Sequence, residues 1–186
     1  ATNGALMIAQ NGSELDAAYG MIENNILFLV FAGNLENNGN KLDIFFMTGP
    51  GGQNTLTNAN PNFGNLNNMA TSTNGFTFHT GFAPNYWIGA NANTSPTFFL
   101  DYAQLVQGGT NSGAVGYFLG QTTITNGTLI GGTNPFGIQA TINDSNTLGV
   151  DGANPGCLTN GSSEIARRNV SMSSRFRVPP PARSMP

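Results

Sequence analysis

The sequence predicts an all-β protein, a β-sandwich or jelly roll of about nine short strands. Asn-Gly pairs, which suit the tight turns of β-hairpins, begin at residues 3, 11, 38, 74, 126 and 160. Between these pairs lie short runs rich in Phe, Ile, Thr and Val. Charged residues make up only 8% of the 186 residues, which is too few to cover the exposed faces of long helices.

The expected strands follow from these runs in chain order. Residues 5–10 form a first strand and residues 15–23 a second, and Asn24 and Asn25 turn the chain into residues 26–32. Because residues 26–32 are apolar at every position, that strand is expected in the middle of a sheet. Further strands are predicted at residues 42–48, 75–80, 86–90, 97–106, 114–125 and 136–142.

Other segments are predicted to be irregular. Residues 49–72 hold Gly, Pro and many Asn, which predicts an irregular excursion with room for one helical turn. Residues 103–107 are a candidate for a second short helix. Residues 151–186 are expected to be a loop and an extended, basic, Pro-rich C-terminal tail, so the sandwich domain covers residues 11–150 and residues 1–10 are a separate N-terminal strand.

The distribution of charge and cysteine excludes several classes of protein. Residues 1–166 contain nine acids and a single cation, Lys41, whereas five arginines lie in the last twenty residues. The body therefore lacks the basic face that nucleic acid requires. Cys157 is the only cysteine, which rules out a disulfide within the chain. No apolar run reaches the roughly 18 residues that would span a bilayer, and the start at Ala1 without a leader is interpreted as a processed N-terminus.

No catalytic residues are predicted, and the chain is expected not to be an enzyme. His79 is the only histidine, and nothing in the sequence places it beside Cys157. The Gly-x-Ser-x-Gly motif of a serine nucleophile does not occur. His79 is therefore interpreted as an ordinary residue of a sheet face.

A calcium site is the one cofactor that the sequence leaves open. Asp144, Asn146 and Asp151 concentrate oxygen ligands of the kind that Ca²⁺ prefers in one loop. The alternative is an Asn-rich turn without metal, because Asn side chains cap their own backbone.

Lys41 is a candidate for an isopeptide bond to an Asn or Asp. It is the only cation of the body and stands two residues before Asp43, at the start of an apolar strand. The alternative is an exposed lysine paired with Asp43.

Tyr86 and Trp87 are candidates for an aromatic platform that stacks on a sugar ring. Such a platform would need an exposed Trp87 and would make the protein a carbohydrate-binding module. The alternative is that Trp87, the only tryptophan, belongs to the core, because large aromatic side chains dominate burial.

Several motifs occur together and in a fixed order. They are Gly12-Ser13-Glu14-Leu15-Asp16-Ala17-Ala18-Tyr19-Gly20, Leu27-Phe28-Leu29, Ala32-Gly33-Asn34-Leu35-Glu36, Asn40-Lys41-Leu42-Asp43-Ile44-Phe45, Gly51-Gly52-Gln53-Asn54 and Gly81-Phe82-Ala83-Pro84-Asn85-Tyr86-Trp87. Over residues 10–150 this order resembles exported bacterial β-sandwich proteins of the PEP-CTERM-sorted type. That family is secreted or surface-anchored, largely without assigned activity, and loosely similar to jelly-roll carbohydrate-binding modules. Phe46 and Met47 stand where the family usually carries an acid, and residues 162–177 lack its further strands.

The scarcity of charge predicts self-association. Unpaired N–H and C=O groups at a sheet edge accept another strand, and Lys and Pro normally guard such edges. The apolar segment Ala5, Leu6, Met7, Ile8 and Ala9 is therefore predicted to be a donor strand that adds to a neighbouring copy. The predicted function is a secreted, non-enzymatic structural subunit of an extracellular fibre or surface layer, with itself as partner. The alternative is a carbohydrate-binding module that binds polysaccharide at the cell surface.

Overall fold

The computed structural model describes residues 14–35, 39, 41–70, 75–92, 97–123, 128–141 and 174–177. The chain divides into two compact units, Ala1–Glu36 with Thr123–Thr128 and Pro135–Pro186, and Asn37–Thr122 with Leu129–Asn134. Each unit contains one antiparallel sheet, and the described residues include 3₁₀-helices but no α-helix. The all-β prediction is confirmed for this part of the chain.

The first unit holds a three-stranded sheet in the order β1-β2-β7. Strand β1 (Glu14–Glu23) and strand β2 (Ile26–Asn34) form a hairpin whose turn residues, Asn24 and Asn25, have φ angles of 50° and 61°. Positive φ at both central positions is what a type I′ turn requires, and Asn tolerates it. The apolar strand β2 lies between two neighbours, as its composition predicts, although most of its side chains are half-buried rather than fully buried.

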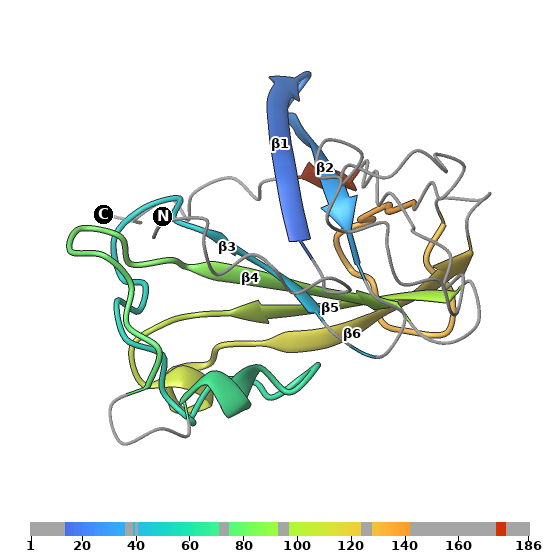
Figure 1. Ribbon diagram of the computed structural model, residues 1–186. Coiled ribbons are helices and arrows are strands. Elements are labelled where there is room, and N and C mark those ends of the chain that lie inside the picture. The colour runs from blue at the N-terminus through green and yellow to red at the C-terminus, as the bar shows by residue number, and fades with distance from the viewer. Residues whose placement is uncertain are drawn as a thin grey trace, which may run out of the picture. The chain divides into compact units, whose positions relative to one another are not determined.

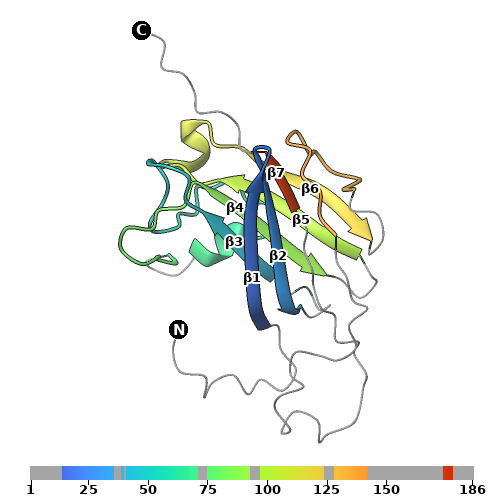
Figure 2. The same cartoon turned by 90° about the horizontal axis from the view of Figure 1, so that it is seen from above.

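The third strand of this sheet was not expected. Strand β7 (Ser174–Arg177) pairs antiparallel with the first half of β2, from Ile26 to Leu29. Figure 2 shows this short strand, in red, beside β2. The expectation that the tail contributes no strand is wrong at these four residues, because β2 offers a second edge with which a short, charged segment can pair.

The second unit holds a four-stranded sheet in the order β3-β4-β5-β6 (Figure 1). These strands are β3 (Lys41–Phe46), β4 (Tyr86–Ala92), β5 (Thr97–Gln104) and β6 (Gly116–Thr123). The two central strands carry buried side chains on both faces, as Trp87 with Ile88 on β4 and Leu100 with Asp101 on β5 illustrate. A 3₁₀-helix, η3 (Gly109–Ser112), lies in the connection from β5 to β6.

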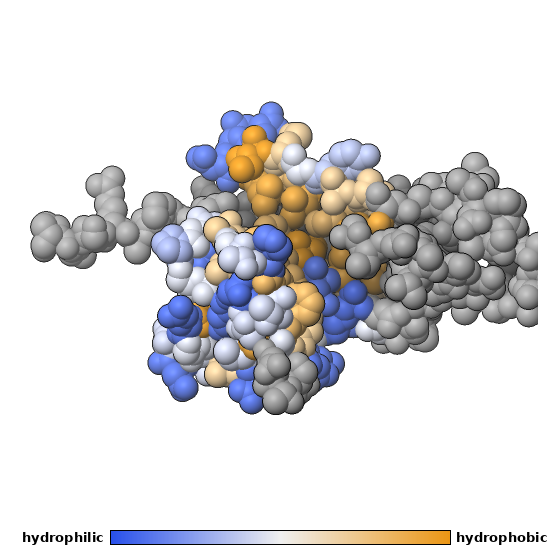
Figure 3. All heavy atoms as spheres, turned by 60° about the vertical axis from the view of Figure 1, so that its left-hand side comes forward, coloured by the Kyte–Doolittle hydropathy of each residue, from blue (hydrophilic) through white to orange (hydrophobic). Residues whose placement is uncertain are grey.

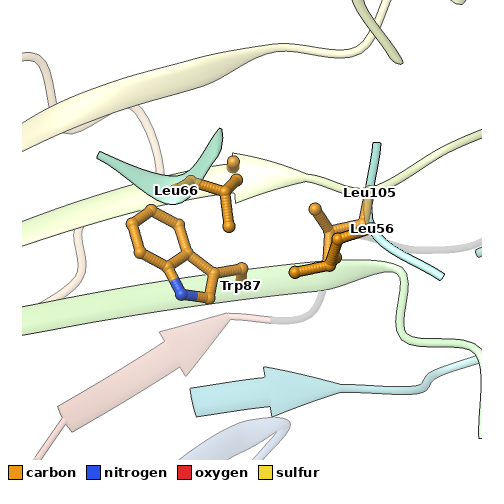
Figure 4. Close-up of a cluster of buried hydrophobic side chains, with 5 residues drawn as sticks. Leu56, Leu66, Trp87 and Leu105 are labelled. Atoms are coloured by element: carbon orange, nitrogen blue, oxygen red, sulfur yellow. The ribbon is translucent and has the colours of Figure 1, made fainter. Parts of the chain in front are cut away.

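The irregular excursion between β3 and β4 covers one face of this sheet. Its described residues include one helical turn, η2 (Leu66–Ala70), as the sequence predicts. Leu56 and Leu66 pack with Trp87 and Leu105 in a buried hydrophobic cluster, with Leu66 facing the indole ring (Figure 4). Phe45, Met69, Ala70 and Phe78 surround that cluster.

Side-chain amides fasten the excursion where strand pairing is absent. Gln53 and Asn60, both buried, exchange two hydrogen bonds of 2.7 and 3.0 Å. The side chain of Asn54 donates to the carbonyls of Phe78, His79 and Phe82. Because buried backbone groups need partners, these amides take the role that a neighbouring strand has in a regular sheet.

Two runs that were expected to be strands are not. In residues 75–80 only Thr77 forms a bridge, to Thr55, and the pairing extends no further than the backbone hydrogen bonds of Phe76 with Leu56 and of Phe78 with Asn54. In residues 136–141, the part of the second run that the structure describes, only Gln139 forms a bridge, to Thr128, while Gly137 adopts φ 62°. Residues 103–107 are not helical either, because their first two residues end β5. The predicted strand at residues 5–10 lies outside the described residues.

Gly52 packs closely against the backbone that immediately precedes β4. A Cβ at Gly52 would collide with the carbonyl oxygens of Ala83 and Pro84, whereas a Cβ at Gly49 would meet nothing within 4 Å. We expect Gly52→Ala to lower the free energy of unfolding by about 1–3 kcal/mol, because backbone must move to make room. Gly49→Ala, the matched control, should change it by about 0.5 kcal/mol or less. Urea unfolding measures both, and equal effects of the two substitutions would contradict this packing.

Candidate functional site

The charged side chains of the second unit gather at one place. Lys41, Asp43 and Asp101 are the only Lys, Arg, Asp or Glu residues within the sequence of that unit. Asp43 on β3 is opposite Gly89 on β4, and Gly89 is in turn opposite Asp101 on β5. Lys41 lies two residues from Asp43 and therefore on the same face of the sheet.

Trp87 forms the apolar wall of this site. It also lies on that face, two residues before Gly89, and its indole ring occupies the space that a side chain at position 89 would take, with Cη2 2.6 Å from the Cβ position. The indole Nε1–H donates a 2.9 Å hydrogen bond to Oδ1 of Asp43. Trp87 has no exposed surface, so this bond is shielded from water on the indole side.

Gly64, in the excursion, lies next to Lys41 and Asp101. Gly64 has φ 52°, a conformation that glycine adopts at little cost. A Cβ at this position would collide with Oδ2 of Asp101 and lie 2.9 Å from Nζ of Lys41. The lysine amine and the Asp101 carboxyl are therefore neighbours beneath the glycine backbone.

Burial decides the electrostatics of the two carboxyl groups. Desolvation raises the pKa of Asp43, although the hydrogen bond from Trp87 and the charge of Lys41 act in the opposite direction. Desolvation also raises the pKa of Asp101, against the attraction of Lys41. Lys41 thus interacts with both carboxyl groups, and both are easier to protonate than an aspartate in water.

The chemistry open to this site is that of one amine and two carboxyl groups. No group of three or more His, Cys, Asp or Glu side chains that could hold a metal occurs among the described residues. Proton exchange between amine and carboxyl, and their condensation to an amide, are the reactions that these functional groups can undergo without a cofactor.

The edge of β1 is the second candidate region. Four large apolar side chains of this strand are strongly exposed, with exposed fractions of 55% for Leu15, 66% for Tyr19, 55% for Met21 and 73% for Ile22. Figure 3 shows apolar residues, in orange, in the upper middle of the view, below a blue tip, and the β1–β2 hairpin lies in the upper part of Figure 1. Among the described residues, β1 pairs only with β2, so its other edge has no strand beside it in that part of the chain.

The predicted sugar platform is not formed. Tyr86 and Trp87 are consecutive residues of β4, so their side chains point to opposite faces of the sheet. The ring of Tyr86 stacks on Tyr102 with centroids 6.1 Å apart, whereas Trp87 is fully buried in the hydrophobic cluster. The core interpretation of Trp87 is the one that the structure bears out.

The remaining sequence-derived sites differ in how far they can be placed. His79 is exposed, and its Nδ1 lies 2.9 Å from the carbonyl oxygen of Thr80. Lys41 is half-buried rather than an exposed loop residue. The proposed donor residues Ala5, Leu6, Met7, Ile8 and Ala9, the candidate calcium ligands Asp144, Asn146 and Asp151, and Cys157 lie outside the described residues.

Asp101 is the site residue that the sequence reasoning missed. It lies within the predicted strand at residues 97–106, and it is the only Lys, Arg, Asp or Glu between residues 44 and 143. A lone acid within a run of Phe, Leu and Tyr is a signal for a buried partner, because an unpaired buried charge is costly.

Comparisons with known proteins give no relative. No family model matches the chain, and no characterised protein and no solved structure matches it either. No helix among the described residues has the length and apolar character needed to cross a membrane.

The pH dependence of stability tests the environment of Asp43. A carboxyl whose pKa rises on folding destabilises the fold when it is ionised, and this cost disappears as pH falls below the folded pKa toward the ordinary value of 3.8. We therefore expect the wild type to gain stability relative to Asp43→Asn as pH falls through that window. The amide keeps an acceptor for Trp87, so the change of this difference with pH reports the ionisation of Asp43.

Urea unfolding of both proteins, followed by the emission of the single tryptophan, measures this difference. Glu23→Gln removes an exposed acid at the end of β1 and is the control. A wild type that loses stability relative to Asp43→Asn on acidification would show that the pKa of Asp43 is lowered by folding.

Proposed function

We propose that this protein is a secreted, non-enzymatic structural subunit that assembles with copies of itself by β-strand addition into an extracellular fibre or surface layer. The observation that carries this proposal is the edge of β1, which is long, apolar and exposed. The resemblance of the sequence over residues 10–150 to exported, surface-anchored β-sandwich proteins supports the extracellular location. A closed sandwich completed by the added strand is part of the proposal.

The chemistry of β1 favours pairing with another strand. Its ten residues carry acids only near the two ends, at Glu14, Asp16 and Glu23, and residues 17–22 are uncharged. Edge strands of monomeric proteins are usually short or carry Lys, Pro or inward charges. The only irregularity of β1 is a register shift between Leu15 and Ala17, so the edge from residue 17 onward is continuous.

The apolar side chains of β1 give such pairing a driving force. Tyr19 and Met21 lie on one face of the strand and Ile22 on the other, and more than half of each side chain is exposed. An added strand would cover part of this apolar surface while it fills the hydrogen bonds of the edge. Burial of apolar surface stabilises by about 25 cal/mol per Å², and the low net charge of −3 opposes association only weakly.

The occupant that we assign to this edge is the segment Ala5, Leu6, Met7, Ile8 and Ala9 of a second copy. These residues are uncharged, and as a strand they are one residue shorter than residues 17–22, so they can pair along nearly all of that edge. A donor from one copy on the edge of the next forms a head-to-tail contact that does not close on itself, so assembly propagates. The alternative, a carbohydrate-binding module, is not favoured by any observation, because Tyr86 and Trp87 present no common face.

Removal of the donor and blockage of the edge should have the same effect. We expect deletion of residues 1–10, or the pair Tyr19→Lys and Met21→Lys, to leave a folded monomer that no longer polymerises, because an edge lysine would have to lose its hydration next to the added strand. Negative-stain images and light scattering after size-exclusion chromatography measure the assembly.

Ile130→Lys is the matched control for the edge variants. Ile130 is also an exposed large apolar residue, but it belongs to the second unit and not to β1. Its substitution should leave polymers intact. Polymers that persist after the deletion would reject the donor role of residues 5–9, and polymers that persist in the double lysine variant would reject β1 as the acceptor.

A further inference from the structure

We propose that Nζ of Lys41 and Cγ of Asp101 join in an intramolecular isopeptide bond that ties β3 to β5, with Asp43 relaying the proton. This covalent link is independent of strand addition and concerns the second unit alone. It gives the lysine that the sequence singles out a specific acceptor.

The placement of the two groups is the first argument. Lys41 Nζ and Asp101 Oδ2 both lie within 3 Å of the Cβ position of Gly64, so they are neighbours in a space that Gly64 leaves free. The strand register aligns Asp43, Gly89 and Asp101 in one row across β3, β4 and β5. Because Gly89 has no side chain, the space above it on β4 is occupied by the indole of Trp87.

The second argument is the concentration of charge. The second unit has no other Lys, Arg, Asp or Glu in its sequence, yet its three charged residues meet on the covered face of one sheet. Asp101 has an exposed fraction of only 8%. Opposite charges that are buried lose hydration that their mutual attraction only partly restores, so conversion to a neutral amide removes that cost.

The reaction balances without any other reactant. The ammonium of Lys41 and the carboxylate of Asp101 exchange a proton to become amine and carboxylic acid, and Asp43, which interacts with Lys41, carries the proton between them. Nζ then attacks Cγ, the Nζ–Cγ bond forms, the Cγ–O bond breaks, and one water molecule leaves. Asp43 returns to its starting state.

The surroundings favour the protonation states that this reaction needs. Burial raises the pKa of both carboxyl groups, which makes protonated Asp101 and a proton-carrying Asp43 accessible. Trp87 holds Asp43 in place through its Nε1–H bond and excludes water from one side. Exclusion of water also slows hydrolysis of the amide once it has formed.

Tryptic digestion of the unfolded protein tests the bond directly. Lys41 is the only Lys or Arg among residues 1–166, so trypsin releases residues 1–41 only if the Lys41 side chain is free. We expect the purified full chain to be lighter than its sequence mass by one water molecule and, after denaturation, to resist cleavage at position 41. Fragmentation of the same material should locate the amide between Lys41 and Asp101.

Three variants complete the test. Lys41→Arg cannot form the bond, so it should have its full sequence mass and be cleaved by trypsin at position 41. Because this variant retains the six Asn-Gly pairs, any mass change from deamidation of their asparagines is the same as in the wild type. Asp101→Ala should also have its full sequence mass and be cleaved. Asp43→Asn should form the bond many-fold more slowly while its Trp87 emission remains that of a folded protein.

A wild type with its full sequence mass that is cleaved completely at position 41 would overturn the proposal, and this result depends on no variant. Loss of ammonia instead of water would identify an asparagine as acceptor and would also overturn it. An Asp43→Asn protein that loses water as fast as the wild type would remove Asp43 as the relay. Failure of strand addition changes none of these readouts.

Discussion

Every buried backbone N–H and C=O needs a hydrogen-bond partner, and this chain has to supply those partners almost without charged side chains. In the second unit, neutral amides meet this requirement. Gln53, Asn54, Asn60 and Asn85 bind the excursion to itself and to the sheet, and Asn85 accepts from the backbone of both Thr48 and Gly49. The excursion can then cover one sheet face without forming strands of its own. In the first unit strand pairing supplies the partners, and β1 has a described partner strand on one side only.

The covered face explains why the few charges of the second unit lie where they do. Trp87 fills the space above Gly89, and Leu56 and Leu66 cover the indole from the excursion. This packing removes water from Asp43 and Asp101 and leaves Lys41 as their common counter-charge. The proposed isopeptide bond depends on this burial, because the low dielectric of the interior changes the relative stability of the charged and neutral forms of these three groups.

The sequence predicts the regular parts of this protein and misses what depends on long-range packing. The composition of β1 and β2 and the turn residues between them are local, so the hairpin and its Asn24-Asn25 turn follow directly from the sequence. The run at residues 75–80 has the composition of a strand, but its backbone pairs with residues 54–56 only around the Thr55–Thr77 bridge, and Phe78 packs against Phe45 and Phe82, which only the fold decides. Lys41 can be singled out by its rarity. Its neighbour Asp101 lies sixty residues away, and only the strand register brings the two together.

Assembly by strand addition requires that the edge of β1 that does not pair with β2 is open in the single chain and pairs with an added strand in the assembly. Amide hydrogen exchange of residues 17–22, compared between dilute monomer and assembled protein, tests that claim directly. Alternate amides, those that do not face β2, should exchange rapidly in the monomer and become protected on assembly, while amides paired with β2 change little. Equal protection of all these amides in the dilute monomer would contradict it, because the edge would then already be covered by the chain itself.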